Sequence, residues 1–447
     1  MRLGRRGAPS AALHCEAVNG ASTSGVLQRA GIASVSELSE LPALERGLRW
    51  FGAQKRWIDS KHLELCRIAA PTFQEERRAA WMAAEFKALG CDVSIDRSGN
   101  VIAEVPSPPA SPLVLITAHL DTVLAPRQPE DVRVNGNGRI EGPGVADNGA
   151  GLAALLALAA AIRSDDEAAA AVRSRIHFIA NVGEEGEGNL SGMRYLCSQF
   201  GGARPPAAVV VLDGPRTDHI TARAVASRRF EVTVTGPGGH SWSDFGVGNP
   251  VQALSRAITL FAESRANGAR GGPPPPGFKT AFNFGTIDGG ATVNSIPTLA
   301  RAKVDLRSEH APLIDELAEA LTGSVERALE IENGRSTGAR LAAKIREIGS
   351  RPSGRLAEDS LLLQSLQAVD SHLGIRARLD CASTDANIPL ALGWEAVTIG
   401  AGGHGGGAHT PSEWYDPEGR DIGLKRILLT VSLLGRLFEA GRMVIPG

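Results

Sequence analysis

The sequence predicts an α/β fold, with a mostly parallel twisted sheet, helices on both of its faces, and an inserted ferredoxin-like α+β domain. Three observations predict it. Apolar runs of strand length at 113–118, 176–182 and 207–212 alternate with helical segments. Between about 228 and 348 the predicted order becomes strand, helix, strand, strand, helix, strand, which is the ferredoxin-like unit. After Pro352 the alternation of helices and strands resumes.

Composition indicates a globular enzyme with more than one domain. A chain of 447 residues is too long for one ordinary domain. A net charge of -2 argues against a nucleic-acid-binding protein, and no apolar run is long and clean enough to cross a bilayer. The cysteines are scattered and lack Cys-x-x-Cys spacing, which indicates reduced thiols and a cytoplasmic protein.

Four segments follow from these patterns. We expect a flexible N-terminal tail at 1–40, because arginines and small polar residues there surround no continuous apolar core. A transit peptide, or a start codon placed too far upstream, is an alternative explanation of this segment. The first part of a catalytic metal-binding domain is expected at 41–222, the inserted domain at 223–352, and the second part of the catalytic domain at 353–447.

The elements are predicted from apolar periodicity and from end signals. Thr72-Phe73-Gln74-Glu75 matches a capping box, which predicts a helix from there to about Leu89. A very apolar helix is expected at about 150–163, after a glycine-rich turn at 142–149. Further helices are predicted at about 44–68, 190–199, 250–265, 312–329, 357–373 and 420–440. Further strands are predicted at 93–105 (interrupted by a turn), 228–235, 278–286, 300–306, 339–348 and 397–399.

Side chains that bind metals or move protons follow the three buried runs. His119 and Asp121 follow the first run, Glu184 and Glu185 the second, and Asp213 the third. In open α/β sheets, ligands bind at the carboxyl ends of the strands. We therefore expect these side chains to meet in one site. Taken alone, each has an ordinary structural explanation, such as a plain turn at Asp213 or a satisfied histidine at a strand end.

Two glycine-rich turns contribute the remaining candidates. Asp147 lies just before the apolar helix, where a helix N-cap is the ordinary alternative, and His409 lies in a loop in which His404 competes with it. Imidazoles and carboxylates together suit zinc, and also manganese or cobalt. Two histidines and three carboxylates are too many for one catalytic zinc, but they suffice for two metals if one carboxylate bridges. Asp147 is the natural bridge, because its glycine turn lets the backbone approach closely.

Such a site permits the hydrolysis of an amide bond. A metal pair polarises a carbonyl and lowers the pKa of a water toward roughly 7. Glu184 can then take the proton of that water and pass it to the leaving nitrogen. Asp121 can accept the second imidazole N–H of His119 and fix its tautomer.

The motifs resemble those of one family of co-catalytic zinc metallopeptidases, which includes peptidase T, carboxypeptidase G, succinyl-diaminopimelate desuccinylase and aminoacylase. The resemblance covers about residues 45–440. It is carried by His119-Leu120-Asp121-Thr122-Val123, Gly142-Pro143-Gly144 with Asp147-Asn148, Glu184-Glu185, Asp213-Gly214 and His409-Thr410-Pro411-Ser412-Glu413.

The resemblance implies a zinc exopeptidase-like fold and a role for each of these residues. One metal would be held by His119, Asp147 and Asp213, and the other by Asp147, Glu185 and His409. Glu184 would be the general base, Asp121 the partner of His119, and the Asp147–Asn148 peptide would be cis.

For the inserted domain, the resemblance implies a lid that also forms a homodimer. His240, in Gly236-Pro237-Gly238-Gly239-His240-Ser241, would stabilise the oxyanion in the active site of the partner subunit. Asn294 would contact the substrate, and Arg307 would bind a substrate carboxylate through its guanidinium fork. Gly402 and Gly403, in the catalytic domain, would let the substrate backbone approach closely. The ordinary alternatives are a surface histidine at 240 and a solvated cation at 307.

The substrate class follows from the resemblance less directly. Asp213, where many relatives carry Glu, favours an aminopeptidase acting on short peptides. The lid sequence 240–246 and the acidic segment 186–189 differ from peptidase T, so an N-acyl-amino-acid amidohydrolase or a carboxypeptidase is the alternative. A non-catalytic relative that uses the lid for association is disfavoured, because a binding module does not need Glu184 as a base.

Overall fold

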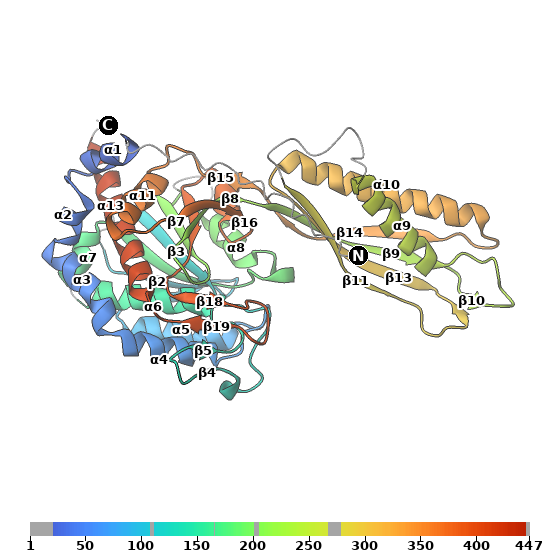
Figure 1. The fold of residues 1–447 in the computed structure, drawn as a ribbon, viewed down its shortest axis with the longest axis horizontal. Helices are drawn as coiled ribbons and strands as arrows, with labels where there is room; N and C mark the ends of the chain where they lie inside the picture. Colours follow the sequence, from blue (N-terminus) through green and yellow to red (C-terminus); the bar gives the residue numbers. More distant parts are fainter. Residues whose placement is uncertain (1–20, 108–110, 165, 201–204, 267–278, 444–447) are drawn as a thin grey trace, which may run out of the picture.

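The computed structural model describes residues 21–107, 111–164, 166–200, 205–266 and 279–443, which form two parts that each contain a sheet and helices (Figure 1). Among these residues, no helix combines the length and the apolar character that a bilayer span requires. Four of the five cysteines belong to the described residues, and all four are free, as predicted.

A large sheet forms the centre of the first part. Its strand order is β1-β2-β6-β3-β7-β17-β8-β15, with β16 beside β8. The four inner strands, β6, β3, β7 and β17, are parallel to one another, while β1, β2 and β15 are antiparallel to their neighbours. The strands are β1 (Asp92–Ile95), β2 (Val101–Glu104), β3 (Leu113–His119), β6 (Arg175–Asn181), β7 (Ala208–Leu212), β8 (His219–Ala224), β15 (Gly354–Arg355), β16 (Arg378–Ala382) and β17 (Ala396–Ile399). The predicted α/β sheet is thus confirmed, with parallel strands in its centre and antiparallel strands toward its edges.

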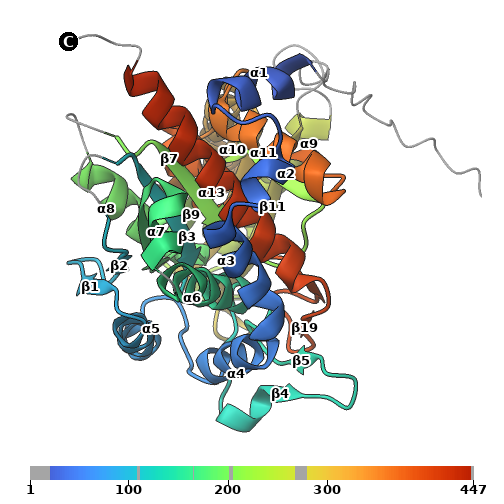
Figure 2. The ribbon, with the colours of Figure 1, turned by 90° about the vertical axis from the view of Figure 1, so that its left-hand side faces the viewer.

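The inner strands are apolar along their whole length because helices cover both faces of the sheet. The helix α6 (Gly149–Arg163) is itself buried on all sides, and Figure 2 shows α13 (Arg420–Met443) lying across the same side of the molecule as α3 and α6. The other helices of this part are α3 (Pro42–Ala53), α4 (Lys55–Cys66), α5 (Glu76–Ala88), α7 (Asp166–Val172), α8 (Ser191–Gln199), α11 (Leu361–Leu373) and α12 (Asn387–Ala391).

The N-terminal segment differs from the prediction. Residues 21–40 were expected to belong to a loose tail, but they contain α1 (Ala21–Arg29) and α2 (Val35–Ser39), which pack against α11 and α13. Val26 and Leu38 are fully buried there. The apolar positions of these two short helices are too few to stand out as a periodic pattern. Residues 1–20 of the predicted tail lie outside the described residues.

The second part, which we call the lid, has the predicted ferredoxin-like order. Its sheet runs β11-β13-β9-β14, and all neighbouring strands are antiparallel. The elements are β9 (Ala226–Thr235), α9 (Pro250–Ala266), β11 (Thr280–Gly289), β13 (Leu299–Ser308), α10 (Ala311–Arg335) and β14 (Ala342–Arg351). Its limits, β9 and β14, lie within a few residues of the predicted boundaries at 223 and 352. A small ladder of β10 (Gly239–His240) with β12 (Ser295–Ile296) lies at the end of the lid that is distant from the central sheet (Figure 1).

A smaller sheet in the first part supports the loops of the site. Its order is β18-β19-β5-β4. It brings a segment near residue 140 beside a segment near residue 415, which the sequence did not predict. The strands are β4 (Arg133–Val134), β5 (Ile140–Glu141), β18 (His404–Gly406) and β19 (Trp414–Asp416).

Two local predictions were wrong. The helix expected at 44–68 is divided into α3 and α4 at Gln54. The capping box expected at Thr72–Glu75 is absent from the start of α5, because the Thr72 hydroxyl donates to Asp121 Oδ2 and Glu75 accepts from the amide of Gly183. Both side chains are used for contacts with the loops that follow β3 and β6.

Candidate metal centre

Three neighbouring parallel strands bring their carboxyl ends together beside the N-terminus of α6. His119 is the last residue of β3 and is paired in register with Asn181, the last residue of β6. Glu184 and Glu185 follow β6, and Asp213 follows β7 on the other side of β3. The sheet order therefore places these residues at one edge, as the sequence predicted.

Asp147 reaches this edge from the turn before α6. The peptide between Asp147 and Asn148 is cis, as the family resemblance implied. Asn148 is the N-cap, and its side-chain oxygen accepts from the amide of Gly151. The alternative explanation of Asp147 as the helix cap is therefore wrong, and its carboxylate is free to point at the strand ends.

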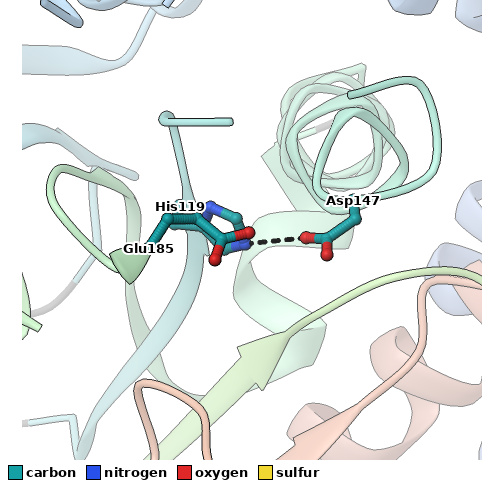
Figure 3. A group of neighbouring side chains, drawn as sticks. All are labelled: His119, Asp147 and Glu185. Atoms are coloured by element: carbon teal, nitrogen blue, oxygen red, sulfur yellow. Dashed lines mark hydrogen bonds and ion pairs between the residues drawn. The ribbon is translucent and has the colours of Figure 1, made fainter. Parts of the chain in front are cut away.

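The centre of the cluster consists of His119, Asp147 and Glu185. His119 Nε2 lies 3.1 Å from Asp147 Oδ1, and the Glu185 carboxylate lies beside the same imidazole (Figure 3). One donor atom from each of the three residues lies within 4.8 Å of the others. This spacing suits a shared divalent cation.

His409 and Asp213 complete the arrangement, one beside Asp147 and Glu185 and the other beside His119. His409 Nε2 lies 3.1 Å from Asp147 Oδ2 and 2.9 Å from a Glu185 carboxylate oxygen. Asp213 Oδ1 lies 3.9 Å from His119 Nε2. Asp147 thus presents one carboxylate oxygen to each imidazole, which is the arrangement required of a bridging ligand. His404, the competing candidate, begins β18 opposite Asp416.

The electrostatics of the cluster fit a divalent metal. Burial and the neighbouring Asp147 carboxylate raise the pKa of Asp213 to about 7, and burial raises the pKa of Glu185 to about 7. A hydrogen bond to Asp147 raises the pKa of His409 to about 9. Carboxylates crowded in this way repel one another, and two imidazoles with three carboxylates are a donor set suited to zinc, manganese or cobalt.

Glu184 lies next to the cluster, with its carboxylate paired to an arginine that the sequence analysis missed. Arg351, the last residue of β14, places Nη1 2.9 Å from Glu184 Oε1, and its Nη2 donates to the main-chain oxygen of Glu184. Both side chains are buried. Burial raises the pKa of Glu184, and the guanidinium opposes this rise. The only signal in the sequence was an arginine followed by proline at the end of the last lid strand.

Asp121 makes different contacts from those expected. His119 Nδ1 lies 2.9 Å from the main-chain oxygen of Asp121 and 3.5 Å from its carboxylate, so the carbonyl is the closer partner of the ring. The carboxylate instead accepts the backbone amides of Glu184, at 3.0 Å, and Glu185, at 2.9 Å. Asp121 therefore connects the loop after β3 to the loop after β6.

The predicted lid residues lie at two different places. His240 and Asn294 are at the distant tip, where Ser241 donates its amide to the main-chain oxygen of Asn294, and they are not brought to the metal cluster of the same chain. Arg307 lies at the end of the lid nearer the cluster, because it pairs with Ser227, which also pairs with Arg351. Its Nε donates to Asp305, which also accepts from Arg229.

Gly402 and Gly403 approach the protein itself. A Cβ on Gly402 would lie 2.8 Å from the main-chain oxygen of Arg420, and one on Gly403 would lie 2.4 Å from the Tyr415 hydroxyl. Both glycines are buried with positive φ. In the direction of a side chain the space is therefore occupied by α13 and β19, and the approach of a substrate backbone to these glycines stays a prediction.

Comparisons with known proteins agree with this arrangement. The profile of the peptidase family M20/M25/M40 matches residues 115–433, which is more than half of the chain. A probable carboxypeptidase of Aspergillus terreus is 28% identical over 218 residues, which cover 46% of this chain and 47% of that protein, so the match spans about half of the length of this curated relative.

Solved structures share the fold over most of the chain. A tripeptidase of Staphylococcus aureus has a TM-score of 0.68 at 20% identity, covering 85% of this chain and 98% of that chain. The aminopeptidase PepT of Bacillus cereus has a TM-score of 0.65 at 17% identity, covering 84% of this chain and 98% of that chain.

Proposed function

Because the chain belongs to the peptidase family M20/M25/M40, we propose that it is a metal-dependent hydrolase of peptide or amide bonds in small substrates, and that it acts as an aminopeptidase on short peptides. The observation that carries the proposal is the position of Asp147 between the imidazoles of His119 and His409, with the buried Glu184 beside them. This arrangement suits a pair of cations next to a base.

In this proposal the residues divide into two sets of ligands and one base. His119, Asp147 and Asp213 would hold one metal ion, and Asp147, Glu185 and His409 would hold the other. When bound, the two ions, which we expect to be zinc, with manganese or cobalt as alternatives, supply Lewis acidity toward the carbonyl and the attacking water.

The chain itself handles the protons. Glu184 takes a proton from the attacking water and delivers it to the leaving nitrogen. The guanidinium of its partner Arg351 favours the ionised form that a base requires and so opposes the effect of burial on this carboxylate. Asp121 fixes the backbone that carries Glu184 by accepting its amide.

The lid has a second proposed role, in a homodimer. His240 lies at the tip of the lid that is distant from the cluster of its own chain, so we propose that it stabilises the oxyanion in the partner subunit. Asn294, next to His240, would contact the substrate there, and Arg307 would bind a substrate carboxylate. We also propose a cytoplasmic location, which suits the free cysteines.

A second activity is favoured by two observations. Arg307 lies near the cluster end of the lid, and the curated relative is named a probable carboxypeptidase. Both favour substrates with a free carboxylate, so an N-acyl-amino-acid amidohydrolase or a carboxypeptidase is the alternative to an aminopeptidase.

A substrate panel separates these activities. The purified protein is incubated with zinc, manganese or cobalt and with tripeptides, dipeptides, N-acetyl amino acids and C-terminal glutamate conjugates. We expect cleavage that requires a free α-amine, and a preference for blocked amines would establish the amidohydrolase instead. Glu184→Gln should keep the metal content and lose turnover. Failure of the parent protein to cleave any amide with any of the three metals would contradict the proposed function.

A further inference from the structure

Glu413 connects two segments that the proposed function requires to share an ion. It follows His409 by four residues, and its side chain is buried although the loop around it is exposed. Its Oε2 accepts the amide of Gly144 at 2.8 Å, and its Oε1 accepts the amides of Ala146, at 2.7 Å, and Asp147, at 2.8 Å. One carboxylate therefore satisfies three backbone donors of the turn that carries Asp147.

The backbone of Glu413 adds to the same connection. Its main-chain oxygen accepts the amide of Gly142 at 2.9 Å, and the next two residues pair with Glu141 and Ile140 as β19 and β5. The two segments are thus joined along their length by both side-chain and main-chain hydrogen bonds.

Apart from the contacts of its imidazole with Asp147 and Glu185, His409 has little else to hold it. Its side chain is 51% exposed, and its backbone has a φ of +63° in a loop that contains Gly407. Burial therefore does not fix the position of the imidazole. The position of His409 relative to Asp147 depends on the nearest firm attachment between the two loops, which is Glu413.

The other side of the Asp147 turn is held independently. His62 Nε2 lies 2.7 Å from the main-chain oxygen of Val145, and the Asn148 side chain contacts the amide of Gly214 and the main-chain oxygen of Leu212. These contacts place Asp147 relative to α4 and β7. None of them reaches the His409 loop, so in the described structure Glu413 is the side chain, other than the proposed ligands themselves, that relates Asp147 to His409.

We propose that Glu413 is a positioning residue that sets the distance between Asp147 and His409, and thereby the affinity of the ion that these two residues and Glu185 would bind. The inference rests on the proposed function, in which Asp147 and His409 share an ion. It concerns the metal-free chain, because the hydrogen bonds of Glu413 form between protein groups alone.

Glu413→Gln tests the inference, because an amide can accept at only one of the two positions that the carboxylate oxygens occupy. Zinc affinity is measured on the full-length protein by competition with a chelating dye. We expect a loss of roughly 10- to 100-fold, as is typical of residues that orient ligands. Hydrogen exchange of the metal-free variant should show faster exchange at the amides of Gly144, Ala146 and Asp147.

A matched control separates positioning from general stability. Asp370 is also a buried carboxylate, bonded to Arg426 between α11 and α13, away from the cluster. Asp370→Asn should lower the melting temperature but leave zinc affinity unchanged. Glu413→Asp, which keeps the charge but shortens the side chain, should give a smaller loss of affinity and serves if Glu413→Gln does not fold.

Unchanged zinc affinity and unchanged amide exchange in both Glu413 variants would overturn the inference. So would an equal loss of zinc affinity in Asp370→Asn, because the effect would then follow stability alone. These readouts do not use a substrate. If zinc affinity depends on Glu413 as expected but the chain cleaves no amide, the proposed activity is contradicted and the positioning role remains supported.

Discussion

Replacement of Asp121 by asparagine should weaken the metal centre without changing any proposed ligand. Asp121 Oδ1 accepts the amide of Glu184, and Oδ2 accepts the amide of Glu185 and the hydroxyl of Thr72. An asparagine must place its NH₂ group at one of these two positions. At that position the NH₂ group faces a buried backbone N–H, which has lost the carboxylate oxygen that accepted its hydrogen bond.

The magnitude follows from these contacts. A hydrogen bond to a charged group contributes about 1.5–3 kcal/mol, and at least one such bond to a backbone amide is lost. Because 1.4 kcal/mol corresponds to about a factor of ten, the loss is roughly 10- to 100-fold if it falls on the loop that carries Glu184 and Glu185. We expect this factor in zinc affinity and a similar factor in kcat/KM.

Zinc competition and steady-state kinetics on the same preparation measure both quantities. Asp370→Asn is the matched control, because both Asp370 oxygens accept hydrogen bonds, from Nε and Nη2 of Arg426, and asparagine can accept at only one of these positions. The control should lose stability and keep zinc affinity. If Asp121→Asn retains both zinc affinity and kcat/KM within twofold, the reasoning that the carboxylate orients the loop is refuted.

Three further outcomes are expected. Removal of metal by a chelator should abolish amide cleavage, and added zinc, manganese or cobalt should restore it; persistent cleavage in the chelated protein would contradict the metal requirement. Arg426→Met should lower the free energy of unfolding in urea by about 3–5 kcal/mol, because it leaves the Asp370 carboxylate buried without its partner. An unchanged urea midpoint would contradict this prediction. Gly144→Ala should lower both the melting temperature and the zinc affinity, because Gly144 has a φ of +74° and an added Cβ would lie 2.4 Å from the Thr122 side chain. A melting temperature and a zinc affinity equal to those of the wild type would show that the turn accommodates the added Cβ.

The proposed ligands could be predicted because each follows a strong local signal. His119 and Asp213 lie at the carboxyl ends of buried apolar runs. In a parallel sheet, the carboxyl ends of neighbouring strands lie at the same edge. Asp147 and His409 follow glycine-rich turns, which the sequence shows directly. The ferredoxin-like order of the lid was predicted for a similar reason, since the alternation along β9 separates its buried face from its exposed face.

The contacts that connect these segments could not be predicted. Arg351 and Glu184 are 167 positions apart, and Glu413 and Ala146 are 267 apart, so only the folded chain brings them together. Asp121 was expected to bond the histidine beside it, but the amides of the loop after β6 take its carboxylate. Charged side chains without periodicity carry no local sign of their distant partners.

The two chain connections between the lid and the rest of the described structure lie close together. β9 and β14 lie side by side, and Ser227 near the start of one is paired with Arg351 at the end of the other. A rotation of the lid about this connection would have its axis close to Arg351, and displacement would grow with distance from that axis. Such a rotation would carry His240 through a wide arc and change the pairing of Arg351 with Glu184 least, so the proposed base would keep its partner.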